Sequence, residues 1–188
     1  MPRHSFEQIY RRRDPWRYLT SPYEQGKYEQ TLKLAGDGTR GRALELGCSE
    51  GAFTEKLALH QVAEQIVGVD ISAVAVERAR ERCARFAQVQ VRQANVLEES
   101  IEGRFDLVFV MEILYYLGSD LGVVCGRLGP ILADGSRVLL VHSLGMLPLH
   151  RGFQEHLGLR LVGEHVEKRT PRPYVVTVLE KGRHDGAP

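Results

Sequence analysis

Residues 43–51 read ALELGCSEG and residues 66–70 read IVGVD, and these two stretches decide the fold. The first predicts a buried strand, a glycine turn and the start of a helix, and the second predicts another buried strand that ends in an acid. Gly47 permits a tight turn with a positive φ, and Gly51 lets the following helix or a ligand approach the first strand. Asp70 stands where an acid meets the ribose hydroxyls in dinucleotide-binding folds. The pattern predicts a site for a nucleoside.

The glycine loop does not suit a dinucleotide. A pyrophosphate needs the spacing G-x-G-x-x-G, because bare backbone must approach it. Here Ser49 replaces the middle glycine and Ala52 the third. The Cβ of Ser49 would crowd a diphosphate, and Glu50 would place a carboxylate beside it. A nucleoside ligand without a pyrophosphate therefore fits this loop better than NAD.

The composition is that of one ordinary globular domain. The chain has 188 residues, of which 43% are hydrophobic and 26% are charged, which is enough for a substantial core. The formal net charge is +1, so no overall field favours nucleic acid as a partner. The basic cluster at residues 11–13 has two interpretations, a solvated start of the chain or a contact for an anionic group on a substrate.

The cysteines and the lengths of the apolar segments limit the cellular settings that we expect for the protein. Cys48, Cys83 and Cys125 show no metal-ligand spacing, and an odd count does not suggest a disulfide framework. No apolar run approaches about 18 residues, which argues against a membrane span, and residues 1–4 lead into no apolar signal segment. We expect a reduced, cytoplasmic setting and no metal, while the oligomeric state stays open.

Strand and helix patterns alternate through most of the chain. The third expected strand alternates polar and apolar residues, which suits an edge strand, while the second, fourth and fifth are nearly continuous apolar runs, as in central parallel strands. The last two strands form an expected antiparallel hairpin. The pattern predicts an α/β fold, a Rossmann-like doubly wound, mostly parallel seven-stranded sheet that ends in this hairpin. The expected strands are 42–46, 65–70, 88–93, 106–111, 137–142, 159–166 and 174–180.

The first part of the chain has a different character. Residues 1–38 carry aromatic side chains between charges and are broken by Pro15 and Pro22. We expect one or two short helices there, forming an N-terminal helical arm or lid over the carboxyl edge of the sheet. Residues 39–182 are the expected α/β domain, and residues 183–188 an expected disordered tail.

The carboxyl ends of the strands predict the ligand contacts, because open α/β sheets bind ligands there. Asp70 has two acceptor oxygens and can accept both ribose hydroxyls. Asn95 can pair with the amino group or a ring nitrogen of adenine, and Ile71 and Val96 can hold the ring between them. A lone asparagine after a strand is also a common turn former, so both roles stay open for Asn95.

These motifs resemble those of the class I S-adenosylmethionine (AdoMet) methyltransferases. Glu45–Gly51 is similar to their E-x-G-x-x-x-G loop, Asp70 to their ribose acid and Ala94–Val96 to their adenine segment. Residues 14–18 (DPWRY) and 21–25 (SPYEQ) resemble the nodulation-type (NodS-like) N-methyltransferases, which methylate an amine of a glucosamine-type sugar. The resemblance implies AdoMet as the cofactor and a small-molecule acceptor. We expect the cofactor to contact Glu45, Gly47, Cys48, Ser49, Gly51, Asp70, Ile71, Asn95, Val96, Met111, Trp16 and Lys27.

An amine acceptor sets a protonation problem. With a pKa of about 10.4, roughly one amine in a thousand is neutral at pH 7. Glu112 is the candidate to hold the amine or ammonium, His142 the candidate base, and Tyr115 or Tyr116 the candidate to orient the substrate or shield the sulfonium. Each has a structural alternative: a helix cap for Glu112, core packing for one tyrosine, and a satisfied strand-end histidine for His142.

Other roles and functions stay open at this point. Trp16 either closes over the ligand or packs the arm onto the sheet, and Lys27 is the candidate partner of the cofactor carboxylate. The second enzymatic function is methylation of a hydroxyl with His142 as base, and the non-enzymatic one is AdoMet binding without turnover. Small-RNA 2′-O-methyltransferases look similar at the fourth strand but use a metal cluster where this chain has Tyr115 and Tyr116. We therefore expect no metal-dependent RNA methylation.

Overall fold

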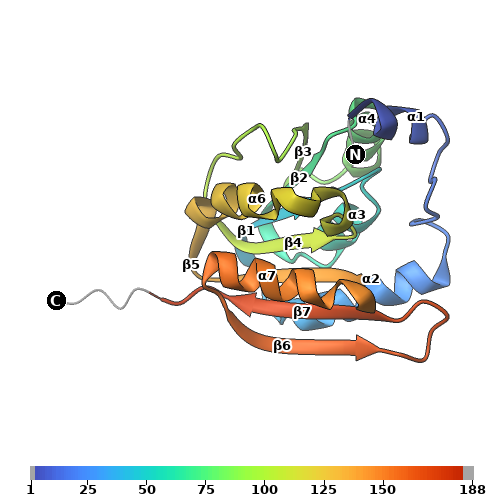
Figure 1. Ribbon diagram of the computed structural model, residues 1–188. Coiled ribbons are helices and arrows are strands. Elements are labelled where there is room, and N and C mark those ends of the chain that lie inside the picture. The colour runs from blue at the N-terminus through green and yellow to red at the C-terminus, as the bar shows by residue number, and fades with distance from the viewer. Residues whose placement is uncertain (1–2, 184–188) are drawn as a thin grey trace.

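The computed structural model describes residues 3–183, and Figure 1 shows the arrangement of its elements. Seven helices and three short 3₁₀ turns surround one sheet in this part of the chain. The helices are α1 (Arg3–Ile9), α2 (Pro22–Ala35), α3 (Ala52–Leu59), α4 (Ala73–Cys83), α5 (Leu114–Leu117), α6 (Leu121–Leu128) and α7 (Leu147–Leu157). The strands are β1 (Arg40–Leu46), β2 (Ala63–Asp70), β3 (Val89–Gln93), β4 (Phe105–Met111), β5 (Leu132–Ser143), β6 (Arg160–Glu167) and β7 (Tyr174–Glu180). The 3₁₀ turns are η1 (Gly118–Asp120), η2 (Gly129–Ile131) and η3 (Leu144–Met146).

The sheet confirms the predicted fold class. Its seven strands follow the order β3-β2-β1-β4-β5-β7-β6. The first five in this order pair in parallel, while β7 runs antiparallel to both β5 and β6. The alternating strand β3 lies at an edge, as predicted. The order reverses at β1, so the carboxyl ends of β1 and β4 flank the crevice where such sheets bind ligands.

Strand β5 is longer than the sequence pattern predicts. It begins at Leu132 instead of Arg137, because Leu132 already pairs with Phe105 of β4. The register then shifts before Arg137 pairs with Leu107. The intervening residues include Gly135, whose φ is +73°. This polar, glycine-containing irregularity hides the first part of the strand from a search for apolar runs.

The core consists of one apolar layer on each face of the sheet, because alternate residues of a strand point to opposite faces. Leu44 and Leu46 of β1 pack on the face covered by α6 and α7, and Ala43 packs on the face covered by α2 and α3. Figure 1 shows these two helical layers on either side of the strands. The two buried faces hold the central strands rigid, and with them the loops that follow their carboxyl ends.

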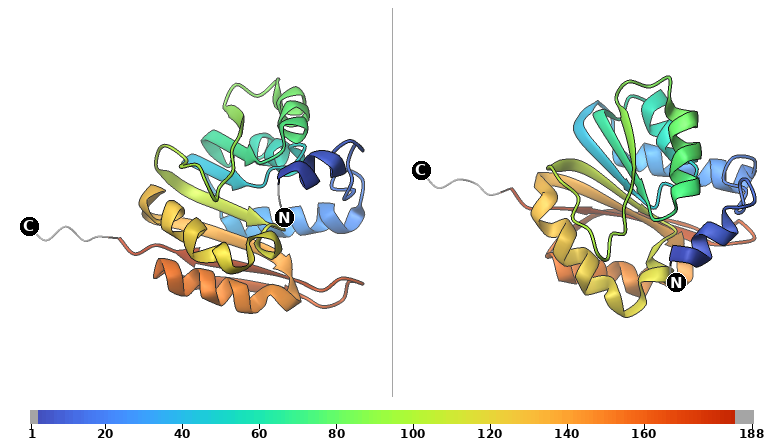
Figure 2. Two further views of the ribbon diagram at one scale, coloured as in Figure 1. Left: turned by 45° about the horizontal axis from the view of Figure 1, so that its top comes forward. Right: turned by 90° about the horizontal axis from the view of Figure 1, so that it is seen from above.

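The predicted arm divides into two parts. Helix α2 is part of the body, because Tyr28 and Ala35 belong to the buried layer beneath the sheet. Helix α1 and the segment up to residue 21 instead lie over the end of the sheet beside α4, as Figure 2 shows. We call residues 3–21 the arm from here on. Its function as a lid stays a prediction.

Two further sequence expectations concern the ends and the membrane. Of the predicted disordered tail, residues 184–188 lie outside the described residues. Between residues 3 and 183, no helix is long and apolar enough to cross a membrane.

Candidate functional site

The glycine turn after β1 is held against the end of β2. The peptide N–H groups of Gly47 and Cys48 both donate to the carbonyl of Val69, at 2.8 and 2.9 Å. Gly47 has a φ of +73°, and a Cβ at this position would lie 2.3 Å from Cγ2 of Ile113. Only glycine satisfies both conditions, the left-handed backbone and the close approach of the loop after β4. The turn therefore joins three strand ends in one place.

Asp70 is a buried carboxylate with acceptor capacity to spare. One of its oxygens accepts the N–H of Ser49 and the other the N–H of Ser72, both at 2.9 Å. A carboxylate has about four acceptor sites, so each oxygen retains room for one more donor. Burial raises the pKa of Asp70 to about 6. This value is still below 7, so the carboxylate is ionised at neutral pH. The geometry suits a vicinal diol, as the sequence predicts.

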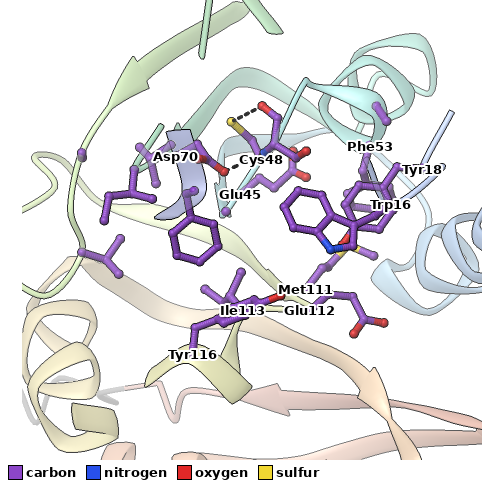
Figure 3. Close-up of a pocket in the computed structure, with 18 of the residues that line it drawn as sticks. Trp16, Tyr18, Glu45, Cys48, Phe53, Asp70, Met111, Glu112, Ile113 and Tyr116 are labelled. Carbon is purple, nitrogen blue, oxygen red and sulfur yellow. Dashed lines mark hydrogen bonds between the residues drawn. The ribbon is translucent and has the colours of Figure 1, made fainter. Parts of the chain in front are cut away.

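A mostly apolar pocket opens beside Asp70. It lies between the carboxyl ends of β1, β2 and β4, the loop after β3, and the arm. Figure 3 shows its lining, with Asp70 and Cys48 on one side and Trp16, Tyr18 and Glu112 on another. The residues that line the pocket include Phe6, Tyr10, Trp16, Tyr18, Glu24, Tyr28, Glu45, Gly47, Cys48, Ser49, Asp70, Ile71, Ala94, Asn95, Val96, Leu97, Met111, Glu112, Ile113 and Tyr116.

The loop after β3 shows the turn-forming role of Asn95, and its pairing with adenine stays a prediction. The side-chain oxygen of Asn95 accepts the N–H of Leu97 at 3.1 Å, which closes a local turn. Asn95 also lines the pocket, together with Ile71 and Val96. The side-chain oxygen is committed to the turn, so the amide NH₂ is the part of Asn95 left for a ligand.

Glu45 places a second buried acid at the pocket. Its Oε2 accepts the hydroxyl of Thr54 at 2.5 Å, and burial raises its pKa to about 8. The carboxyl is therefore poised between its neutral and charged forms near neutral pH. A cationic group placed beside it would favour the charged form.

The far end of the pocket holds a charge cluster that joins α2 to the end of β4. Lys27 is 1% exposed; its Nζ lies 2.7 Å from Oε2 of Glu24 and also pairs with Glu112. Burial lowers the pKa of Lys27, but the charges of Glu112 and Glu24 outweigh this, so the pKa is raised. Burial raises the pKa of Glu112, against the opposing effect of Lys27. Lys27 is thus bound to two carboxylates, and its predicted pairing with a cofactor carboxylate is wrong for this arrangement.

The prediction that His142 is the base is also wrong. His142 is fully buried and does not line the pocket. Its Nε2 lies 3.2 Å from the N–H nitrogen of Ile113 and 3.1 Å from that of Leu114. Since peptide N–H groups only donate, the lone pair of Nε2 is occupied. Burial and the neighbouring His150 hold the pKa of His142 well below its usual value.

The two tyrosines of α5 take different positions. Tyr115 is 37% exposed, does not line the pocket and packs edge-on against His142, with ring centroids 5.3 Å apart. Its predicted place in the site is therefore wrong. Tyr116 lines the pocket and packs edge-on against Phe6 of the arm. Figure 3 shows Tyr116 beside Ile113 on the floor of the pocket.

Gly51 serves packing between helices. It is not among the residues that line the pocket, and its contact with the cofactor stays a prediction. Its φ is +78°, and a Cβ there would lie 3.0 Å from both Cα and Cβ of Ala79 in α4. The sequence allows two uses for Gly51, the close approach of a helix or that of a ligand. The structure shows the approach of a helix, but this helix is α4 and not α3.

The arm is fastened over the pocket at two points. The carboxylate of Glu7 accepts hydrogen bonds from the N–H of Ala73 at 2.7 Å and the hydroxyl of Ser72 at 2.8 Å, at the start of α4. Further along, the N–H of Asp14 donates to Oε2 of Glu50 at 2.8 Å. These contacts bring the aromatic side chains of the arm onto the ligand pocket.

The sequence identifies the pocket residues that the arm contributes less completely than the others. Trp16 was identified, but Phe6, Tyr10 and Tyr18 also line the pocket, and α2 adds Glu24 and Tyr28. The aromatic residues between charges in the first 38 positions were the available signal. No pattern indicated Glu24, because its partner Lys27 is an ordinary helical neighbour in sequence.

The described residues show no cluster of three or more His, Cys, Asp or Glu side chains that could hold a metal. All three cysteines are free and buried.

Comparison with known proteins decides the family. The model of the family described as Nodulation protein S (NodS) matches residues 4–128. The chain belongs to the NodS family. This places it among the class I AdoMet-dependent methyltransferases, as the sequence motifs indicate.

Relatives and solved structures agree with this placement. The chain is 37% identical over 129 residues to Nodulation protein S of Rhizobium tropici, covering 67% of this chain and 53% of that protein. It is 41% identical over 105 residues to Nodulation protein S of Bradyrhizobium diazoefficiens, covering 55% and 49%. The chain thus spans about half the length of these NodS relatives. The crystal structure of the N-methyltransferase NodS from Bradyrhizobium japonicum WM9 with S-adenosyl-L-homocysteine (AdoHcy) superposes with a TM-score of 0.82, at 26% identity, covering 95% of this chain and 97% of that one.

Proposed function

We propose that this NodS-family chain transfers a methyl group from AdoMet to an amine of a small molecule. The observation that carries the proposal is a single pocket with two chemically different ends. One end presents Asp70, with spare acceptors for a diol, and the other presents Glu112 and Glu24 around Lys27. The related NodS structure with AdoHcy, described as an N-methyltransferase, supports the same reading.

The pocket residues fit AdoMet. Asp70 would hold the ribose hydroxyls, and Ile71 and Val96 would flank the adenine. The buried carboxyl of Glu45, whose pKa burial raises to about 8, would take up a cationic amino group. Ser49 stands in the pocket where a pyrophosphate would need a glycine, so the loop leaves no cradle for it.

AdoMet supplies a methyl group on a sulfonium, a good leaving group. The contribution of the protein is orientation, which accounts for several kcal/mol of the barrier, roughly 7–11 in the best-aligned cases. Trp16 and Tyr18, with rings stacked 5.8 Å apart, and Tyr116 bound to Phe6 of the arm exclude water from the reacting centre. We also propose that the arm acts as the lid of the α/β domain.

Glu112 is the residue that we assign to the acceptor nitrogen. Lys27 pairs with Glu24 and Glu112. Arg172 pairs with Glu24 at 3.4 Å, so two cations balance the two carboxylates when all four groups are ionised. Glu112 lines the pocket and has a second carboxylate oxygen beside the one paired with Lys27, and this oxygen can meet an acceptor that arrives as an ammonium. A lysine-like ammonium costs about 4–5 kcal/mol to deprotonate at pH 7. Burial raises the pKa of Glu112, and this makes its carboxylate a better proton acceptor than an exposed one.

The proton transfer then follows from this arrangement. The proton leaves the nitrogen for the carboxylate of Glu112, and the freed lone pair becomes available to the methyl group. This assigns to Glu112 the base role that the sequence gave to His142. The stacked faces of Trp16 and Tyr18 suit a flat apolar ring face, and an amino sugar is the acceptor class that we propose first.

The test compares Glu112→Gln with a matched control. Glutamine keeps the shape of Glu112 but cannot take the proton, so kcat/KM for the amine should fall about 100-fold or more, the range for a general base. AdoHcy affinity, measured by calorimetry, should stay within about twofold, because binding at the nucleoside end does not depend on this charge. Glu29→Gln, an exposed change on α2, should alter neither quantity.

The outcomes separate the functions. Normal turnover of an identified amine by Glu112→Gln removes Glu112 from the acceptor site. Turnover of a phenol or alcohol, with amines inert, replaces the proposal with O-methylation. AdoHcy binding without turnover of any acceptor class leaves an AdoMet-binding domain.

A further inference from the structure

Three buried polar side chains form a continuous chain of hydrogen bonds behind the pocket. His142 of β5, His150 of α7 and Thr177 of β7 are each no more than 3% exposed. Nδ1 of His142 lies 2.9 Å from Nε2 of His150, and Nδ1 of His150 lies 2.8 Å from Oγ1 of Thr177. At the other end, Nε2 of His142 meets the peptide nitrogens of Ile113 and Leu114.

The contacts fix the direction of every hydrogen bond in this chain. The two peptide N–H groups only donate, so Nε2 of His142 carries no proton and accepts from both. Nδ1–H of His142 must then donate to Nε2 of His150, and Nδ1–H of His150 must donate to Thr177. Both histidines are neutral, because burial lowers the pKa of His150 to about 4 and holds that of His142 well below its usual value. One tautomer of each ring satisfies all the contacts.

The near end of this chain holds the turn that carries Glu112. Glu112 has a φ of +55°, which is unfavourable for a residue other than glycine. The next two peptide N–H groups belong to the start of α5, where no intrahelical acceptor exists. His142 supplies that acceptor. Ile113 in turn fills the space that Gly47 leaves open, so the turn touches the cofactor loop as well.

We propose that His142, His150 and Thr177 are positioning residues, a one-directional hydrogen-bond relay that fixes the Glu112–Leu114 turn and aims Glu112 at the acceptor end of the pocket. The inference rests on the proposed function for its effect on catalysis. Its structural half, the fixed tautomers and the held turn, is measurable without any substrate.

The matched test is Thr177→Val against Thr177→Ser. Valine keeps the shape and removes the hydroxyl, so His150 loses the acceptor for its Nδ1–H. If His150 moves this proton to Nε2, two donors face each other and His142 must move its own proton to Nε2, against the two peptide N–H groups. Serine keeps the hydroxyl and removes only a methyl group. A relay makes Thr177→Val the harmful change, whereas simple packing makes Thr177→Ser the harmful one.

Two readouts report the result. In ¹⁵N imidazole spectra, the wild type and Thr177→Ser should show His142 with Nδ1 protonated and Nε2 bare, and Thr177→Val should show a mixture or the opposite tautomer. The amides of Ile113 and Leu114 should lose hydrogen-exchange protection only in Thr177→Val. In activity, kcat for the amine should fall about 10- to 100-fold in Thr177→Val, the scale of a slightly misplaced group, and AdoHcy affinity should change less than kcat.

Several results would overturn the relay. A wild-type spectrum that shows His142 protonated at Nε2 would overturn the relay by itself, even if a variant fails to fold. The relay would also be overturned if Thr177→Val kept the wild-type tautomers, amide protection and kcat, or if Thr177→Ser were the more damaged variant. If the wild type methylates no amine but the tautomers and protected amides are found as described, the proposed function fails and the relay stands as the support of the turn.

Discussion

Replacing Asp70 with alanine should weaken AdoHcy binding by a predictable amount. Each carboxylate oxygen accepts one peptide N–H, from Ser49 and Ser72, and about two acceptor sites remain for the ribose hydroxyls. Hydrogen bonds to a charged group contribute about 1.5–3 kcal/mol each, and water replaces part of what is lost. We expect a net loss of about 2–3 kcal/mol, which is roughly a 30- to 150-fold rise in the dissociation constant.

The same change should leave the ligand-free protein folded. Burial raises the pKa of Asp70 from 3.8 to about 6, so at neutral pH the ionised carboxylate destabilises the folded state by about 3 kcal/mol. Alanine removes this penalty but leaves two buried peptide N–H groups without an acceptor, at about 1–3 kcal/mol each. The two effects offset one another, and the melting temperature should move little.

Isothermal titration calorimetry with AdoHcy and with NAD is the assay. Asp106→Ala is the matched control, because Asp106 also accepts a peptide N–H, from Arg42 at 2.8 Å, but at the opposite end of its strand. AdoHcy should bind the wild type and Asp106→Ala equally, and NAD should bind none of the proteins. Unchanged AdoHcy affinity in Asp70→Ala, or an equal loss in the control, would refute the assignment of Asp70 to the ribose.

Three further predictions follow from the same structure. Below pH about 6, AdoHcy affinity should fall by up to a further tenfold per pH unit, because the hydroxyls bind the ionised form of Asp70, whose pKa is about 6; calorimetry across pH 5–8 checks this, and Asp70→Ala should lose this added fall while keeping the dependence due to Glu45, whose pKa is about 8. Gly51→Ala should destabilise the protein by roughly 1–3 kcal/mol in urea unfolding, since its Cβ would lie 3.0 Å from Ala79, and an unchanged midpoint would contradict the packing role. Hydrogen exchange of residues 5–30 should slow on AdoHcy binding, with the gain within the arm and little in the core helix α2; equal exchange with and without AdoHcy would leave the arm as static packing.

The sequence predicts the sheet and the positions of Gly47 and Asp70 at its carboxyl edge well, because their signals are local. A glycine turn between a buried strand and a helix, and an acid at the end of the next strand, need only neighbouring residues to be recognised. Asp70 and Gly47 therefore lie where the motifs put them. The parallel strands are equally plain, since burial on both faces produces continuous apolar runs.

The acceptor end was harder because it depends on contacts between distant segments. Lys27 pairs with Glu112 across 85 positions of sequence, and no spacing rule indicates such a pair. The sequence could not tell Tyr115 from Tyr116, because the start of a four-residue helix sets which of the two side chains lines the pocket. His142 did carry a signal: it shares a strand face with Val138 and Leu140, which pack toward α6 and α7.

Transfer of a methyl group from AdoMet to a nitrogen is tested most directly by NMR of the product formed from AdoMet with a ¹³C-labelled methyl group. The protein is incubated with glucosamine, with N-acetylglucosamine as the matched acceptor whose nitrogen is blocked, with other small amines, and with a phenol. The account predicts a new labelled methyl bound to nitrogen, formed together with an equal amount of AdoHcy, and no product from the blocked sugar. A labelled methyl on oxygen, or AdoHcy binding with no labelled product from any acceptor, would contradict it.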